Sequence, residues 1–285
     1  MPSTAIRLRL FLTCWIVFVL HFATDFVREH YLVIGIVEDH SYALDKYYGL
    51  HVDIFQNPPE APVQGAHHGA NPGMSMLAAI PYALLRPGVD WVVSRELAAR
   101  ATRPDTAVVY NDSRPRRVEF YHKIRSMGLD IRFGLVSAIT QVFCMAPISA
   151  ASVVLLFSLL GRLGIGVRTS LGLSLLYAFG TPVFFRTAYL NQNLALGFST
   201  FAGFLLLWNP NRLSQWSVRT RYLVAGLLGG FAFLCDYSGA ILMGLVGFYA
   251  WWRRTDEATI GAGFRDSLWY ALGCLPGILL LWQYQ

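Results

Sequence analysis

Long apolar stretches alternate with short polar ones over most of the chain. Seven of these stretches are close to the length of a helix that crosses a bilayer, which needs about 20 apolar residues, with 17 to 25 usual. They run approximately over Leu10–Val27, Phe133–Leu160, Thr169–Phe185, Leu194–Trp208, Tyr222–Cys235, Ala240–Trp252 and Ser267–Trp282. The pattern predicts an all-α integral membrane protein with about seven transmembrane helices.

Arginines in the short polar loops predict how this bundle is oriented. Loops 161–168, 209–221 and 253–266 each hold two or three arginines, whereas the short loops on the opposite side hold only Arg186. Basic residues mark cytoplasmic loops. The N-terminus has two arginines in its first nine residues and no small-residue cleavage site, so we expect a retained cytoplasmic end. The predicted location is a bacterial-type inner (plasma) membrane, crossed several times.

The stretch between the first two apolar segments is predicted to be one large outer loop, residues 28–132. It holds 12 Lys or Arg and 12 of the chain's 17 Asp and Glu. Residues 74–94 within it are apolar but interrupted by two prolines, so we expect interfacial or re-entrant helices there rather than a crossing. The chain is predicted to be one domain, 1–285, formed by this periplasmic loop and a helical bundle over 133–285.

Composition supports a membrane protein and excludes several other classes. Apolar residues make up 55 % of the chain, charged residues 14 %, and the mean hydropathy is +0.44. The net charge of +6 comes largely from arginines in the short loops between apolar segments, where basic residues are explained by membrane orientation. No nucleic-acid partner is therefore predicted. Four isolated cysteines in apolar stretches indicate buried thiols rather than a disulfide framework, and the pattern indicates no metal and no cofactor. These cysteines are Cys14, Cys144, Cys235 and Cys274.

Acidic side chains follow the first apolar stretch. Counted at 1.5 Å per residue from Leu10, Asp25 is expected at the outer membrane boundary, with Arg28 and Glu29 one turn further on the same face. A carboxylate there could take a proton from a hydroxyl, or it could simply pair with Arg28 as an interfacial cap. A second candidate is Asp53 in YYGLHVDIF, 47–55. Its apolar neighbours would raise the pKa of its carboxyl group, or alternatively Asp53 lies on the solvent-facing side of an amphipathic segment. The candidate catalytic carboxylates are Glu29, Asp53, Asp25 and Asp39.

Basic and polar side chains elsewhere on the outer side suggest a binding surface. The stretch YNDSRPRRVEFYHK, 110–123, mixes arginines with aromatic residues, which suits lipid phosphate, although a solvated loop remains an alternative. Further polar residues end helices on that same side. The candidates in these two groups are Arg114, Arg116 and Arg117, and Arg186, Asn191, Asp236 and Tyr237.

The arrangement resembles the GT-C glycosyltransferases that use polyprenyl-phosphate donors, such as protein O-mannosyltransferases and the aminoarabinose transferase of lipid A. In REHYL, Glu29 and Tyr31 occupy the place of that family's acidic residue and the aromatic residue after it. NPGMSMLAAIPYAL, 71–84, is similar to its proline-containing interfacial segment. LLYAFGTPVFFRTAYLNQN, 175–193, is similar to its span that ends in a Gly/Ser-Pro turn.

This resemblance implies an inverting glycosyltransferase, with a polyprenyl-phosphate sugar donor and membrane lipids as partners. Arg28 replaces an acid of the family pattern and Asn71 replaces a lysine, so binding of the donor phosphate would pass to other arginines. Those arginines are Arg86, Arg186 or the cluster Arg114–Arg117. The family usually has more spans, so the chain would be a fragment or a reduced member. Alternatives from other classes are a polar-lipid transporter or flippase and a non-catalytic membrane scaffold.

Overall fold

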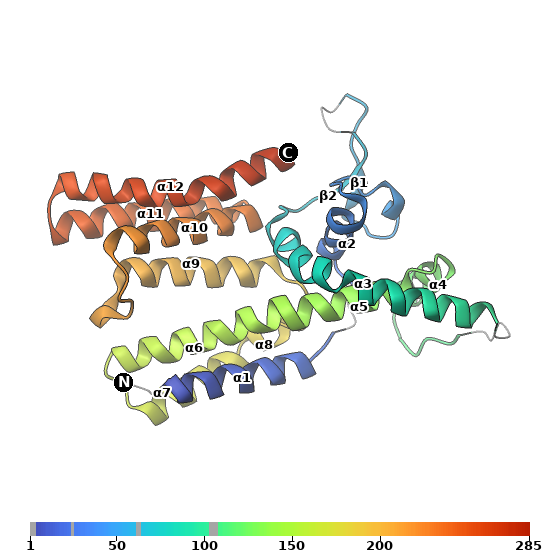
Figure 1. The fold of residues 1–285 in the computed structure, drawn as a ribbon, viewed down its shortest axis with the longest axis horizontal. Coiled ribbons are helices and arrows are strands. Elements are labelled where there is room, and N and C mark those ends of the chain that lie inside the picture. The colour runs from blue at the N-terminus through green and yellow to red at the C-terminus, as the bar shows by residue number, and fades with distance from the viewer. Residues whose placement is uncertain (1–3, 24–25, 61–63, 103–107) are drawn as a thin grey trace.

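The computed structural model describes residues 4–23, 26–60, 64–102 and 108–285, and these are mostly helical (Figure 1). The helices are α1 (Thr4–Leu20), α2 (Arg28–Ile34), α3 (Gly73–Ala101), α4 (Pro115–Ser126), α5 (Asp130–Thr140), α6 (Ala146–Arg162), α7 (Val167–Phe179), α8 (Pro182–Arg186), α9 (Gln192–Trp208), α10 (Val218–Cys235), α11 (Ser238–Glu257) and α12 (Ile260–Tyr284). Short π-helical segments are η1 (Gly35–Asp39) and η3 (Gln141–Met145), and short 3-10 segments are η2 (Asp45–Tyr47) and η4 (Pro210–Arg212). Strands β1 (Ile54–Gln56) and β2 (Ala66–His68) form an antiparallel pair. The predicted all-α membrane fold is confirmed.

The helices form a bundle with two different ends (Figure 1). Helices α1, α6 and α9–α12 run side by side, and α10 packs on α9, α11 and α12. The first turn of α1 and the loops at 163–166, 209–217 and 258–259 gather at one end. Helices α2, α3 and α4 and the strand pair gather at the other. The arginine-rich loops therefore share one end, as the sequence pattern requires.

The seven predicted apolar segments fall mainly on helix, but the first is shorter than expected and Thr169–Phe185 is divided between α7 and α8 at Gly180 and Thr181. Helix α1 ends at Leu20, and Val27 is the N-cap of the separate helix α2. The prediction of one helix running from Leu10 to Val27 is therefore wrong, and so is the placement of Glu29 one turn beyond Asp25 on it. Asp25 itself lies outside the described residues.

Among the residues that the structure describes, three helical stretches are long and apolar enough to cross a bilayer by length and composition, and a fourth is apolar but shorter. The three are Gly73–Ala101, Asp130–Arg162 and Val218–Cys235, and the shorter one is Gln192–Trp208. The number of helices that cross therefore stays a prediction.

Helix α3 is continuous, contrary to the prediction of a broken segment at 74–94. It runs for 29 residues through Pro81 and Pro87. Each proline removes one backbone hydrogen bond, and neighbouring turns and packing keep such a helix together in apolar surroundings. In Figure 1 it lies beyond the end of the bundle, where it packs on α2 and α5.

Helices α10 and α12 approach each other through paired glycines. Gly226 and Gly230 on α10 face Gly273 and Gly277 on α12, so both helices carry the G-x-x-x-G spacing that allows close backbone approach in membranes. A Cβ atom on Gly277 would lie 2.2 Å from the carbonyl oxygen of Gly230. A side chain at that position would therefore force the two helices apart.

The longest helical stretch contains a change of helical type. Helices α5 and α6 continue into one another through η3, which gives one stretch from Asp130 to Arg162. Single π-helical turns inside α-helices are rare and frequently accompany functional sites. This interruption lies next to a row of buried polar side chains.

Candidate functional site

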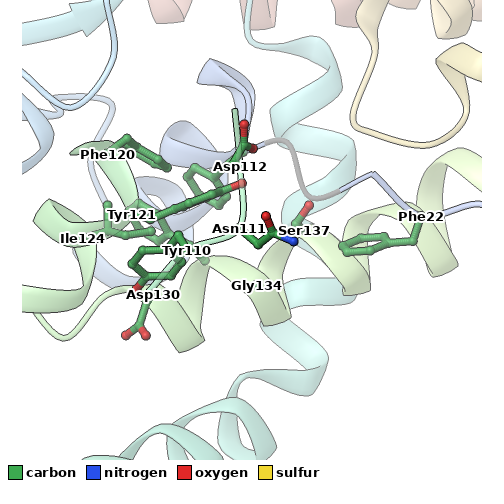
Figure 2. Close-up of a pocket in the computed structure, with 12 residues that line it drawn as sticks. Phe22, Tyr110, Asn111, Asp112, Phe120, Tyr121, Ile124, Asp130, Gly134 and Ser137 are labelled. Atoms are coloured by element: carbon green, nitrogen blue, oxygen red, sulfur yellow. The ribbon is translucent and has the colours of Figure 1, made fainter. Parts of the chain in front are cut away.

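A cavity of about 430 Å³ lies where the chain after α1, the segment before α4 and the first turns of α5 meet (Figure 2). Half of the residues that line it are aromatic: Phe22, Phe26, Tyr110, Phe120, Tyr121 and Phe133. Aromatic rings carry partial negative charge on their faces and partial positive charge at their edges. The partially positive edges of these rings can therefore contact an anion in the cavity. In Figure 2, Asn111 extends toward Ser137, so the cavity also contains an amide and a hydroxyl group.

The first carboxylate of the cavity, Asp112, is paired with arginines. Arg114 donates to it from Nε and Nη2, both at 2.9 Å, and Nη1 of Arg117 lies 3.8 Å away. The hydrogen bonds from Arg114 hold the pKa of Asp112 below its usual range. Asp112 is therefore ionised at neutral pH, and its charge is opposed by two guanidinium groups.

The second carboxylate, Asp130, has the same kind of environment. Arg100 donates to both of its oxygens at 2.9 Å, and Arg125 lies 3.5 Å away. Two carboxylates at the cavity wall thus have four arginine partners, and because Arg100 also pairs with Glu96 at 3.3 Å, the network has an excess of one positive charge. A concave surface with such an excess raises the local concentration of anions.

Beyond the cavity, buried polar side chains form a row along the long helix of α5, η3 and α6. Its members are Ser137, Thr140, Gln141, Ser149 and Ser152, and each is at most 4 % exposed. Ser137 and Thr140 are three residues apart, as are Ser149 and Ser152, so the members of each pair lie close together on the helix. Gln141 directly follows Thr140 and faces α1, whereas Thr140 faces α2. We call this row the polar stripe. Buried hydroxyl and amide groups are costly in a membrane unless they are hydrogen-bonded, and in membrane helices they often hydrogen-bond to a neighbouring helix.

The part of the polar stripe nearest the aromatic cavity, from Ser137 to Gln141, contacts the cavity and α2. Thr140 Oγ1 lies 3.1 Å from His30 Nε2 and donates to the carbonyl oxygen of Ser137 at 3.1 Å. Gln141 Nε2 donates to the carbonyl oxygen of Phe18 at 2.6 Å. Ser137 Oγ and Gln141 Oε1 are buried without a hydrogen-bond partner among the described residues. Ser137 belongs to both the cavity and the polar stripe and so joins them.

The part of the polar stripe farther from the cavity, Ser149 and Ser152 on α6, faces α7 and the residue after α8. The hydroxyls of Ser149 and Thr187 lie 2.7 Å apart. Tyr177 donates to Ser152 Oγ at 3.2 Å, and Ser152 donates to the carbonyl oxygen of Ser149 at 2.7 Å. From Ser137 to Ser152 the helix rises by about 22 Å, and it continues for ten residues, about 15 Å, beyond Ser152 to Arg162.

His30 sets the direction of the hydrogen bonds at the end of the polar stripe nearest the cavity. Its ring is fully buried, and this burial lowers the pKa of His30 to about 3, so the ring is neutral at pH 7. The backbone N–H of Val27 donates to Nδ1 at 3.0 Å. Nε2 therefore carries the proton and donates it to Thr140 Oγ1.

The structure brings together three of the residues that the sequence singled out after α1. Arg28 Nε lies 3.3 Å from Glu29 Oε1, and its Nη1 lies 3.0 Å from Asp53 Oδ2. Glu29 is 5 % exposed, and burial raises its pKa. Asp39 lies apart from this group and pairs with Lys46 at 2.6 Å.

The other outer candidates do not converge on one site. Arg86 donates to the carbonyl oxygen of Val37 at 2.8 Å, and Tyr31 is fully buried. Arg114 and Arg117 pair with Asp112, which lines the aromatic cavity, and Arg114, Arg116 and Arg186 are exposed.

The candidates near the start of α9 and α11 have local roles. Asn191 caps α9 through Leu194, and Asp236 accepts a hydrogen bond from Gln192 at 3.1 Å. Tyr237 and Asn71 line a separate cavity of about 370 Å³. Asn71 also donates to the carbonyl oxygen of Phe233 at 3.0 Å.

Comparison with known proteins gives one likeness to report. No family model and no solved structure matches the chain significantly. A stretch of 122 residues, 42 % of this chain, is 35 % identical to the "Fluoride-specific ion channel FluC" of Xanthomonas euvesicatoria pv. vesicatoria and covers 78 % of that protein. On this match the chain belongs to the FluC family.

This match corrects the function expected from the sequence. The FluC protein is named as an ion channel and not as an enzyme, so the predicted inverting glycosyltransferase activity is contradicted. The choice of Asp25 and Glu29 as bases depended on one helix that continued past Leu20, and the structure separates α1 from α2. The GT-C resemblance itself and the polyprenyl-phosphate partner stay untested predictions. The polar stripe was missed, although Ser, Thr and Gln at helical spacing inside an apolar segment could have revealed it.

Proposed function

We propose that this protein provides a path for a small anion across the membrane, with fluoride as the first ion to test. The membership in the FluC family motivates the choice of ion. The observation that carries the proposal is the polar stripe, which places buried hydrogen-bond donors along a helix long enough to cross a bilayer.

The aromatic cavity would act as the entrance. Its arginine excess attracts anions, and ring edges and the Asn111 amide can contact an ion that has lost part of its water. Asp112 and Asp130 would not repel the ion strongly, because each is opposed by two guanidinium groups. The entrance thus selects charge sign before the ion reaches the helix.

Hydroxyl groups of the polar stripe would then replace water around the ion. Each serine or threonine has one rotatable O–H donor. Those of Thr140, Ser149 and Ser152 now point to a carbonyl or to a neighbouring hydroxyl, and that of Ser137 has no partner among the described residues. An anion can take that donor in exchange for the present acceptor, so binding at each step stays weak. Conduction needs this kind of weak, repeated binding.

The orientation we propose has the N-terminus in the cytoplasm. The arginine-rich loops lie at the same end of the bundle as the N-terminus, and such loops are retained on the cytoplasmic side. The aromatic cavity, at the other end, would then open on the outer side of a bacterial inner membrane.

Flux from vesicles tests the proposal. Purified protein is reconstituted into vesicles loaded with potassium fluoride, diluted into fluoride-free buffer and treated with valinomycin, and a fluoride electrode records release. We expect release well above that of protein-free vesicles, with chloride retained in a parallel preparation. Fluoride release equal to that of protein-free vesicles would overturn the proposal, whatever the chloride result.

A further inference from the structure

A second concave surface lies at the end of the bundle opposite the aromatic cavity. It is a groove of about 700 Å³ between α1, α6, α9 and α10. Its wall is mainly apolar and includes Phe11, Val154, Leu155, Phe198, Ala202 and Leu228. These side chains are partly exposed rather than buried, so the groove is open at the side of the bundle.

The length of the groove matches one leaflet of a bilayer. On α9 its lining runs from Phe198 to Leu206, eight steps of 1.5 Å or about 12 Å. A bilayer's hydrocarbon is about 30 Å thick, so one leaflet contributes about 15 Å. The groove can therefore hold one acyl chain of the leaflet nearest the N-terminal end of α1.

The other end of the groove is polar and positively charged. Arg7, Ser214, Gln215 and Trp216 line it. Ser214 is held in place because its N–H donates to Asn209 Oδ1 at 2.6 Å. A guanidinium group binds phosphate through charge-assisted hydrogen bonds, and a tryptophan suits the membrane interface.

We propose that this groove binds one anionic phospholipid, with its phosphate at Arg7 and an acyl chain along Phe198 and Ala202. We expect an anionic headgroup, because the helix ends and loops at this end of the bundle carry more basic than acidic residues. The basic residues are Arg162, Arg168, Arg212, Arg219, Arg221, Arg253, Arg254 and Arg265, and the acidic ones are Asp256, Glu257 and Asp266, of which Glu257 and Asp266 pair with Arg253, Arg254 or Arg265. The inference does not depend on the proposed anion path, which uses the opposite end of the bundle and the inner side of α6.

Native mass spectrometry of the full-length protein in detergent tests this proposal. Equal amounts of phosphatidylglycerol and phosphatidylcholine are added, and we expect one retained phosphatidylglycerol per protein in preference to phosphatidylcholine. Arg7→Gln should weaken that binding about tenfold, the effect of losing one charge-assisted hydrogen bond. Arg9→Gln is the matched control, because Arg9 is exposed and outside the groove, and it should bind as the wild type does.

A groove-filling variant separates the acyl site from the headgroup site. Ala202→Trp should remove the retained lipid, whereas Leu173→Trp, on the exposed face of α7, should not. Thermal melting of each variant shows whether it is folded. Equal retention of the two lipids by the wild type, unchanged binding in Arg7→Gln, or displacement of the lipid by inorganic phosphate alone would overturn the proposal.

Discussion

The Nε2 atom of His30 lies 3.1 Å from Thr140 Oγ1, and this contact ties the short helix α2 to the polar stripe. The neutral ring fixes the direction of the hydrogen bond, since Nδ1 already accepts from Val27. Thr140 in turn donates to the carbonyl oxygen of Ser137. One buried histidine thus sets which polar atoms face the path near its entrance.

Removal of the Thr140 hydroxyl should slow fluoride movement. Thr140→Val keeps the shape of the side chain but leaves the ion one donor short at a buried position. The loss of one hydrogen bond to a charged group is worth about 1.5–3 kcal/mol, so we expect a roughly tenfold or greater fall in the initial rate of fluoride release. Thr200→Val is the control, because Thr200 is on α9 and outside the polar stripe. Equal rates in both variants would exclude Thr140 from the path.

Stability should fall as the pH drops below neutral because of buried histidines. Burial lowers the pKa values of His30 and His68 to about 3, below the ~6.5 of an exposed histidine. The unfolded state then binds more protons between those values, so stability is complete above about pH 6.5 and is lost as the pH falls toward 3. Each histidine contributes about 1.4 kcal/mol per pH unit in that range.

Thermal melting between pH 7 and pH 5 measures this effect. His30→Gln should reduce the fall in the free energy of unfolding by about 2 kcal/mol, which is one histidine's share over the titrating part of that interval. His122→Gln, at an exposed position, should leave the pH dependence unchanged. Identical pH profiles for wild type and His30→Gln would show that His30 is not held neutral by the fold.

The ion pairs around Arg28 should stabilise the fold rather than perform chemistry. Arg28→Met leaves Glu29 buried without its cationic partner, at a cost of about 1–3 kcal/mol. Glu29→Gln should be milder, and adding it to Arg28→Met should recover part of the loss because the buried charge is gone. Thermal melts of the wild type, both single variants and the double variant give the coupling energy. A strictly additive double variant would show that the pair is not coupled.

The paired glycines of α10 and α12 should tolerate no side chain. Gly277→Val places a Cβ atom against the Gly230 carbonyl oxygen, and overpacking of this kind costs about 1–3 kcal/mol or more. Gly244→Val on α11 meets no atom within 4 Å and serves as the control. We expect a lower melting temperature for the first variant only, and equal melting temperatures would contradict the close approach.

The helical fold could be read from the sequence because apolar stretches of sufficient length leave the backbone little alternative in a membrane. The end of α1 at Leu20 could not be read, since the apolar pattern continues to Val27 while the chain leaves the helix. The continuity of α3 was missed because its two prolines are tolerated within a packed helix. In both cases tertiary packing outweighed the local signal.

The site was harder to predict than the fold. Arg28 and Asp53 are 25 positions apart in the sequence and yet form an ion pair beside Glu29. Nothing in the residues around them predicts this contact. The polar stripe consists of ordinary serines, a threonine and a glutamine, which single-residue arguments about acids and bases pass over. Charged residues predicted catalytic candidates, whereas the proposed anion path consists of the uncharged hydrogen-bond donors of the polar stripe.

The voltage at zero current across a planar bilayer tests the anion path most directly. With purified protein and a tenfold fluoride gradient, at equal chloride on both sides, a fluoride-selective path should give a zero-current voltage near 59 mV with the sign expected for an anion. Reversing the gradient should reverse that sign. A voltage of zero, or no current above that of the bare bilayer, would contradict the account.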